Sequence, residues 1–217
     1  MIKAVIFDFD GTIADSFEVF VKTLHKLLRK DAAPSDSEIQ DLRGKQVKEI
    51  MSLLGIKPWQ VAQLVVRGRK EVANSFDSIE VFGHVPNLIE QLSKEYTLYI
   101  VSTNSKHVIA DFLNKNELQP YFKAIYADIG LMSKPASLKR LMGTYGYTAS
   151  EVMYIGDEVR DSKAAQKVKM KCISVDWGYS TRESLEQNNP GYVASSVDEV
   201  LAIMSAYENA NSNLRNT

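Results

Sequence analysis

Two carboxylates, Asp8 and Asp10, follow the first apolar run of the chain, within the sequence AVIFDFDGT of residues 4–12. Side chains of a strand repeat their direction at every second residue, so the two acids project toward the same side. Acids crowded at the edge of an apolar sheet repel each other and lose solvation. They persist when a cation lies between them or when one of them is protonated. The pair therefore predicts a magnesium ion together with a carboxylate nucleophile.

Further polar residues follow three later apolar runs. They are Ser102, Thr103 and Asn104, then Lys134, and then Asp157, Glu158 and Asp161. Lys134 is expected in the loop just before a helix that begins at Pro135. Acids bind a hard cation, whereas a lysine, a hydroxyl group and backbone amides bind an anion such as phosphate. Four segments that are remote in sequence thus supply the groups needed to hold a metal ion and a phosphate.

The elements that must position these residues alternate between strands and helices. The continuous apolar run of residues 2–7 predicts a strand that is buried on both faces. Further strands are expected at 96–103, 123–127, 152–155 and 171–175, and helices at 106–115, 135–145, 160–169 and 197–207. This alternation predicts an α/β fold with a mainly parallel sheet flanked by helices. Such sheets bind ligands beyond the carboxyl ends of their strands, where the four polar segments fall.

The region between the first strand and residue 82 shows helical patterns and no convincing strand. Breaks at 32–35 and 55–58 separate its helices, Ser35 or Asp36 caps the second of them, and a further helix is expected at 59–75. The expected units are a Rossmann-like core of residues 1–14 and 83–208, an inserted all-helical cap of residues 15–82, and a disordered tail of residues 209–217.

The overall composition is that of an ordinary soluble globular protein, with 217 residues of which 45% are hydrophobic. The 26 basic and 27 acidic residues leave no basic excess for binding nucleic acid or an anionic membrane. No apolar run approaches the roughly 20 residues that cross a bilayer, and no leader precedes the first strand. A single cysteine, Cys172, excludes an internal disulfide. We expect a cytoplasmic protein that is a monomer by default.

Four signatures in this sequence resemble those of the haloacid dehalogenase-like superfamily of phosphohydrolases. They are Asp8-Phe9-Asp10-Gly11-Thr12, Thr103-Asn104, Lys134-Pro135, and Gly156-Asp157 with Asp161. The resemblance covers about residues 1–205 and implies a Mg2+-dependent phosphatase for a small phosphorylated metabolite, similar to phosphoglycolate phosphatases. The dehalogenases of the superfamily lack an acid at the position of Asp10, because no oxygen leaving group needs a proton. Asp10 therefore favours phosphate over halide chemistry.

The resemblance also implies roles for the residues of these signatures. Asp8 would be the nucleophile that takes the phosphoryl group as an aspartyl-phosphate. Asp10 would be the general acid for the leaving oxygen and then the base for the hydrolytic water. Thr103 would hydrogen-bond a phosphoryl oxygen, and Lys134 would pair with Asp8 and with the phosphoryl charge.

The metal ligands implied by the resemblance are Asp8, the backbone carbonyl of Asp10, and Asp157, which together would hold Mg2+. Asp161 would contact the ion through a water molecule or stabilise its ligands, and Glu158 is the weaker candidate for this position. The sequence leaves open which of Asp161 and Glu158 ligates the metal directly.

Candidate substrate contacts lie in two places. Asn104 adjoins Thr103 in the second signature. In the expected cap, Arg43 and Lys45 flank Gly44 between two helices, and related helical-cap enzymes place a glycine flanked by basic residues there. A solvated basic turn is the alternative interpretation of that cap segment.

Two other functions remain open at this point. A β-phosphoglucomutase-like phosphotransferase has the same core and a similar cap, but its substrate rather than water accepts the phosphoryl group from Asp8. An isomerised sugar phosphate, rather than free phosphate, would identify such an enzyme. A regulatory phosphate-binding protein without turnover would be expected to lose at least one signature, and none is lost here.

Overall fold

The core of the structure is a six-stranded sheet. The computed structural model describes residues 1–28, 33–45, 47–60, 64, 67, 78–127 and 133–213. The strands are β1 (Ala4–Phe7), β4 (Thr97–Val101), β5 (Phe122–Tyr126), β6 (Val152–Gly156), β7 (Lys171–Val175) and β8 (Val193–Ala194). They lie in the order β5-β4-β1-β6-β7-β8, and every neighbouring pair is parallel. This arrangement confirms the predicted α/β class with a parallel sheet.

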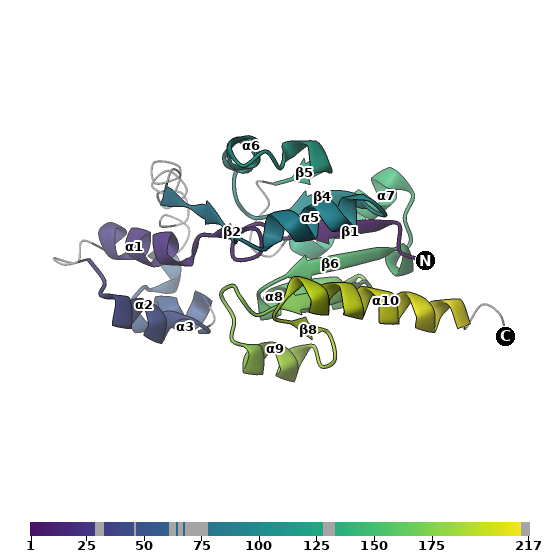
Figure 1. The fold of residues 1–217 in the computed structure, drawn as a ribbon. Coiled ribbons are helices and arrows are strands. Elements are labelled where there is room, and N and C mark those ends of the chain that lie inside the picture. The colour runs from purple at the N-terminus through teal and green to yellow at the C-terminus, as the bar shows by residue number, and fades with distance from the viewer. Residues whose placement is uncertain are drawn as a thin grey trace.

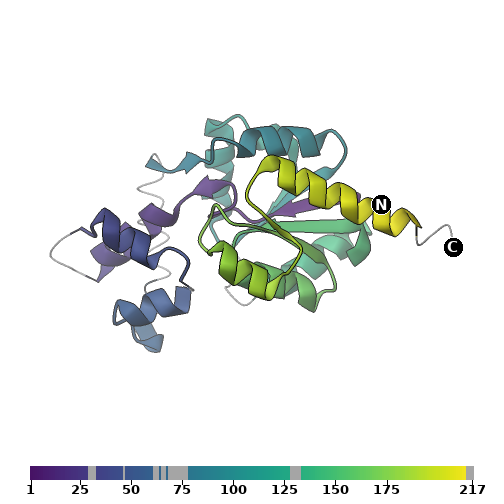
Figure 2. The ribbon, with the colours of Figure 1, turned by 60° about the horizontal axis from the view of Figure 1, so that its bottom comes forward.

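Helices cover both faces of this sheet (Figures 1 and 2). The helices on one face are α5 (Val85–Ser93), α6 (Lys106–Lys115) and α10 (Val197–Asn213), and those on the other are α7 (Lys134–Tyr145) and α8 (Val159–Lys167). Helix α9 (Arg182–Asn188) packs beside α8. Strand β1 lies between β4 and β6, and all four of its residues are buried, because both of its faces meet helices.

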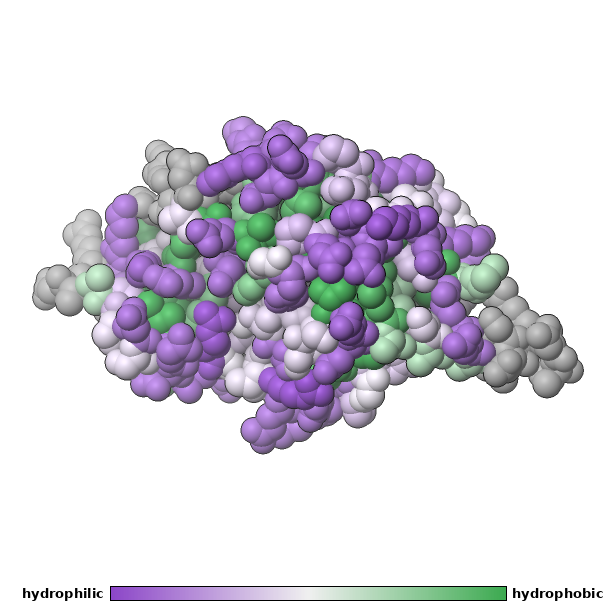
Figure 3. All heavy atoms as spheres, in the orientation of Figure 1, coloured by the Kyte–Doolittle hydropathy of each residue, from purple (hydrophilic) through white to green (hydrophobic). Residues whose placement is uncertain are grey.

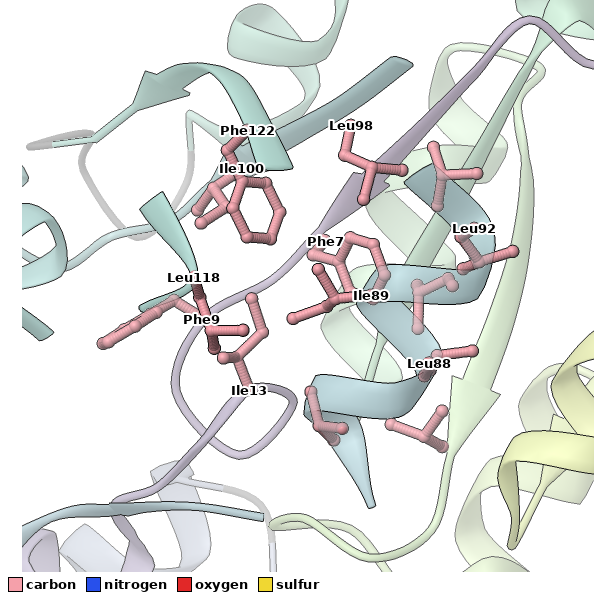
Figure 4. Packing of buried hydrophobic residues seen from close by; sticks show 14 of the residues in the cluster. Phe7, Phe9, Ile13, Leu88, Ile89, Leu92, Leu98, Ile100, Leu118 and Phe122 are labelled. Carbon is pink, nitrogen blue, oxygen red and sulfur yellow. The ribbon is translucent and has the colours of Figure 1, made fainter. Parts of the chain in front are cut away.

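The packing of β1 explains how the residues after it are aimed. Val5 and Phe7 belong to the hydrophobic cluster on the α5 side, and Ala4 and Ile6 belong to the cluster on the other side. Phe9 continues the first series and points into the same core, as Figure 4 shows. Its ring meets the Phe112 ring of α6 edge to face, with the centroids 5.1 Å apart. Core packing therefore anchors the loop that carries Asp8 and Asp10.

A helical segment lies beyond the carboxyl end of β1 (Figure 1). Its described elements are α1 (Phe17–Leu27), α2 (Asp36–Leu42), α3 (Val47–Leu53) and the short 3-10 helix Pro58–Gln60. Helices α1, α2 and α3 share a hydrophobic cluster of their own, which Tyr179 joins from beyond β7. Strand β2 (Ala14–Asp15) pairs with β3 (Glu80–Val81) at the two ends of this helical segment. The division of the chain into a core and a cap remains a prediction.

Several predicted boundaries agree with the structure and others differ. Ser35 caps α2 through a capping box, as predicted. Lys134 is the first residue of α7 rather than a loop residue, because Pro135 is compatible with the first turn of a helix. The short strands β2 and β3 were not predicted, since two-residue strands carry no periodicity.

The C-terminal helix differs from its prediction. Helix α10 continues to Asn213, past the expected end at residue 207, so residues 209–213 are helical and not disordered. The helix packs against α5 and β8, and each residue added to a formed helix gains a hydrogen bond without a new nucleation cost. Residues 214–217 and most of the expected helix at 59–75 lie outside the described residues.

Figure 3 shows that hydrophilic residues cover most of the displayed face, with hydrophobic atoms in scattered groups. The large hydrophobic side chains that are exposed in the described part of the chain are Met1, Leu53 and Trp59. No helix in that part is both long enough and apolar enough to cross a membrane.

Candidate active site

A buried lysine lies between two carboxylates at the carboxyl edge of the sheet. Lys134, at the start of α7, donates a hydrogen bond from Nζ to Asp8 Oδ2 at 2.5 Å and another to Asp161 Oδ1. All three side chains are at most 3% exposed. The sequence predicted the pairing of Lys134 with Asp8, whereas its contact with Asp161 was not predicted.

The charges of this trio are set by burial and by mutual attraction. Burial raises the pKa of Asp8 from its ordinary value of 3.8 to about 7, although the Lys134 ammonium opposes the shift. Burial lowers the pKa of Lys134, but the negative charges of Asp161 and Asp8 outweigh it and leave that pKa above the ordinary value. Lys134 is therefore a cation at neutral pH that partly neutralises two acids.

Three carboxylates of this region are arranged to hold a metal ion. Asp8, Asp157 and Asp161 each offer an oxygen that lies within 4.8 Å of the other two, and all three side chains are buried. Burial and then the charges of Glu158, Asp161 and Asp8 raise the pKa of Asp157 well above its ordinary value. A divalent cation would relieve that repulsion, and oxygen ligands suit a hard cation. The three acids therefore fit such an ion.

The two candidates for the additional ligand differ in their surroundings. Asp161 belongs to the cluster of three, and its Oδ2 also accepts the Glu158 backbone N–H at 3.0 Å, which caps α8. Glu158 instead pairs with Arg160, whose Nε lies 2.8 Å from Glu158 Oε1. Of the two candidates that the sequence left open, the structure groups Asp161 with Asp8 and Asp157.

Asp157 is held by donors on both of its oxygens. The Thr12 hydroxyl donates to Oδ1 at 2.7 Å, and the Tyr179 backbone N–H donates to Oδ2 at 2.8 Å. Gly11 packs directly against this carboxylate with φ at +77°, and a Cβ there would lie 2.2 Å from Asp157 Oδ2. Only glycine combines this backbone conformation with so close an approach. The Gly-Thr pair after Asp10 therefore serves to position Asp157.

Asp10 faces hydrogen-bond donors from two segments. Its Oδ1 accepts from the Ser16 hydroxyl at 3.0 Å, and the Asn104 side-chain amide donates to Oδ1 at 3.2 Å and to Oδ2 at 3.1 Å. Burial raises the pKa of Asp10, and these two donors limit the rise. Asn104, a predicted substrate contact, thus binds Asp10 in this structure, and Thr103 lies half-buried beside it at the end of β4.

The loop after β7, residues 176–181, adds residues that were not predicted for the site. Tyr179 contacts Asp157 through its backbone and Ser16 through its hydroxyl, at 3.1 Å between the two oxygens. The Trp177 indole donates to the Thr12 carbonyl at 3.2 Å. Both residues lie beyond the carboxyl end of a parallel strand, the position that identified the other site segments. The same criterion, applied to the predicted strand 171–175, points to them.

The segment of Arg43, Gly44 and Lys45 meets this loop. Arg43 Nη1 donates to the Gly178 carbonyl at 3.2 Å, and its guanidinium carbon lies 4.7 Å from the centroid of the Phe17 ring. The Gly44 backbone N–H donates to the Tyr179 carbonyl at 2.7 Å. Lys45 is exposed. The turn between α2 and α3 is thereby hydrogen-bonded to the loop after β7, next to Asp157.

Comparisons with known proteins agree with this geometry. Residues 5–175 match the family model for haloacid dehalogenase-like hydrolases. A phosphoglycolate phosphatase from Synechococcus elongatus is 31% identical over 207 residues, which cover 92% of this chain and 95% of that protein. The fold is similar to a haloacid dehalogenase-like family hydrolase from Streptococcus pneumoniae, with a TM-score of 0.77, 24% identity and coverage of 94% and 98% of the two chains. A predicted phosphatase from Clostridium acetobutylicum also gives a TM-score of 0.77, at 23% identity over 96% and 99% of the chains. The chain belongs to the haloacid dehalogenase-like hydrolase family.

Proposed function

We propose that this protein is a Mg2+-dependent phosphatase that hydrolyses a small phosphorylated metabolite through an aspartyl-phosphate on Asp8. The observation that carries the proposal is the contact of Asp8 with the buried Lys134, next to the carboxylates of Asp157 and Asp161. The phosphoglycolate phosphatase from Synechococcus elongatus supports it as a relative. Phosphoryl transfer depends mainly on positioning and on neutralising charge, which this arrangement favours.

Asp8 and Asp10 divide the chemistry between them. In the first step a carboxylate oxygen of Asp8 attacks phosphorus, the ester P–O bond breaks, and the leaving oxygen takes a proton from Asp10. In the second step water gives a proton to Asp10 and attacks phosphorus, which releases phosphate and restores the Asp8 carboxylate. The raised pKa of Asp10 suits this exchange, because the group must hold a proton in one step and accept one in the next.

The positive charge needed for the attack of Asp8 on phosphorus would come from Lys134 and from the metal ion. Lys134 neutralises Asp8 and is placed to meet a phosphoryl oxygen bound beside it. Asp8, Asp157 and Asp161, with the backbone carbonyl of Asp10, would hold Mg2+. When bound, the ion supplies positive charge that offsets the repulsion between a carboxylate nucleophile and a phosphate dianion.

Recognition of the substrate involves residues around this centre. We propose that Thr103 donates a hydrogen bond to a phosphoryl oxygen. Asn104 orients Asp10, a role that its two hydrogen bonds to the Asp10 carboxylate support. Contacts of Arg43 and Lys45 with the rest of the substrate stay a prediction. Arg43 is held at the junction by Gly178, so its guanidinium would meet only a substrate group that reaches this junction.

Phosphate release from a panel of esters tests the proposal. We expect the wild-type protein with Mg2+ to release phosphate from 2-phosphoglycolate or another small alkyl phosphate, and to stop when a chelator is added. Asp8→Asn removes the nucleophile and should lower kcat by at least about 1,000-fold. Asp41→Asn, which changes an exposed acid of α2, is the matched control. Release from no ester, or full activity of Asp8→Asn, would refute the proposal.

The same panel separates the phosphotransferase alternative. With β-glucose 1-phosphate, a mutase forms glucose 6-phosphate and releases little phosphate, whereas a phosphatase releases phosphate from one of the esters without isomerising it. We expect the second result, because the relative with 31% identity is a phosphatase.

A further inference from the structure

Tyr179 occupies a position between the reacting acid Asp10 and the proposed metal ligand Asp157. The residue is 7% exposed, and its hydroxyl lies 3.1 Å from Ser16 Oγ, which in turn lies 3.0 Å from Asp10 Oδ1. Its backbone N–H donates to Asp157 Oδ2 at 2.8 Å. One residue of the β7 loop is therefore connected to both acids.

The direction of the hydrogen bonds follows from the number of protons. Ser16 has one hydroxyl proton, and it donates that proton to the Asp10 carboxylate. The hydrogen bond between Ser16 and Tyr179 must then have the tyrosine hydroxyl as its donor. A tyrosine hydroxyl carries its proton at neutral pH. The chain runs from Tyr179 to Ser16 to Asp10, and each bond polarises the next.

The tyrosine ring is fixed on several sides. Its centroid lies 4.9 Å from that of Phe17, edge to face, and 5.8 Å from that of Phe20. Its carbonyl accepts the Gly44 backbone N–H at 2.7 Å. With ring and backbone both held, the hydroxyl has little freedom, so it sets the orientation of the Ser16 oxygen.

We propose that Tyr179 is a positioning residue for proton transfer by Asp10, acting through Ser16. Ser16 and Asn104 both donate to Asp10 Oδ1, whereas among the described residues only Asn104 donates to Oδ2. The proton that Asp10 gives to the leaving oxygen is therefore carried on Oδ2, and the Tyr179–Ser16 pair keeps that oxygen turned away from Ser16. This inference rests on the proposed function.

Dependence on the leaving group distinguishes positioning from packing. An alkyl phosphate needs a proton on its leaving oxygen, whereas p-nitrophenolate leaves without one. The value of kcat/KM reports steps up to phosphorylation of Asp8, where this difference acts. Loss of orientation at Asp10 therefore lowers kcat/KM for the alkyl ester selectively, while damage to the fold or to the metal site lowers both.

The experiment compares Tyr179→Phe with wild type on the best alkyl ester of the panel and on p-nitrophenyl phosphate. We expect kcat/KM to fall about tenfold for the alkyl ester and to stay within about twofold for p-nitrophenyl phosphate. Ser16→Ala should show the same selectivity. The double variant should lose no more than Ser16→Ala alone, because both changes break one chain. Phe20→Leu, which alters packing on the ring without touching the hydroxyl, is the control and should not change the ratio of the two esters.

The outcomes separate this inference from the function on which it rests. If wild type hydrolyses neither ester with Mg2+, the proposed phosphatase function is wrong and the inference falls with it. If wild type is active but Tyr179→Phe slows both esters equally, or slows neither, only the inference is overturned. Additive losses in the double variant would also overturn it.

Discussion

Replacing Asp157 by asparagine is expected to make the metal-free protein more stable at neutral pH. Asp157 is buried with Asp8 and Asp161, and burial followed by the charges of Glu158, Asp161 and Asp8 raises its pKa well above 3.8. Ionising this group in the folded protein therefore costs free energy. Asparagine has nearly the same shape and carries no charge, so it removes that cost.

The neighbouring Asp8 gives a reference for the size of this effect. Burial raises the pKa of Asp8 from 3.8 to about 7. Between these values the folded protein keeps a proton that the unfolded chain has lost, so stability falls as pH rises, by about 1.4 kcal/mol per pH unit. Over this interval of roughly three units, the free energy of unfolding falls by about 4 kcal/mol for this carboxyl. Removing one of the repelling charges recovers a part of such a cost, and we expect a gain of about 2 kcal/mol.

Asparagine at position 157 also keeps its hydrogen bonds. Its amide oxygen takes the place of Oδ2 and accepts the Tyr179 backbone N–H. Its NH2 group then faces Thr12 Oγ1, and that hydroxyl turns to accept instead of donating. The Thr12 hydroxyl proton gives up Asp157 as its acceptor in this arrangement, which offsets part of the gain from removing the charge.

Urea unfolding at neutral pH, with a chelator and with Mg2+, measures both consequences. Wild type should gain about 2.7 kcal/mol when the free Mg2+ concentration is 100 times its Kd. Asp157→Asn should be the more stable protein in chelator and should gain little from Mg2+, and Asp41→Asn should behave like wild type. The reasoning is refuted if Asp157→Asn is less stable than wild type in chelator, or if Mg2+ stabilises both proteins equally.

Three further changes test other parts of the structure. Lys169 follows the end of α8 with φ at +60°, so Lys169→Gly should raise the free energy of urea unfolding by about 0.5–1 kcal/mol, and a decrease would contradict this. A Cβ on Gly44, whose φ is +84°, would lie 2.1 Å from Thr181 Cγ2, so Gly44→Ala should cost about 2–3 kcal/mol. Adding Thr181→Ser, which keeps the cap of α9 but removes that methyl group, should recover part of the loss in the same assay. Hydrogen bonds from Lys3 and Thr148 lower the pKa of Glu151 to about 2, so its stabilising effect is present above pH 4.5 and is lost as pH falls through 2. In acid unfolding monitored by circular dichroism, Glu151→Gln should therefore lose less stability than wild type between pH 4.5 and 2. A profile identical to that of wild type would contradict this prediction.

The long elements of the sheet domain were predictable from sequence because each one carries a strong local signal. The predicted helix 106–115 agrees with α6, and the predicted strand 171–175 agrees with β7. Both faces of these strands are buried, so their apolar runs are continuous and easy to locate. Short elements such as β2 and β8 have two residues each and depend on tertiary pairing, which local patterns do not contain.

The candidate site was predictable in its acids and lysine but not in the contacts that orient them. Asp8, Lys134 and Asp161 come from three segments, and a rule about strand ends brings these segments together without specifying which atoms meet. Asp161 illustrates the limit, because an acid in the first turn of a helix is explained equally well by capping. In the structure it both caps α8 and binds Lys134.

The loop after β7 was not predicted, because its residues are not of the reactive types that mark the other strand ends. Trp177, Gly178 and Tyr179 carry no carboxylate, ammonium or thiol group, yet they follow a predicted strand at the same edge as Asp8 and Asp157. Their influence passes through backbone groups and packing: a Cβ on Gly178 would lie 2.3 Å from the Gly11 carbonyl oxygen and 2.4 Å from Asp157 Oδ2. Gly11, after the first predicted strand, and Gly178, after the fifth, thus both pack against the Asp157 carboxylate. A glycine within a few residues after a buried parallel strand, next to a predicted acid cluster, is therefore a signal for a supporting loop even where its neighbours carry no reactive group.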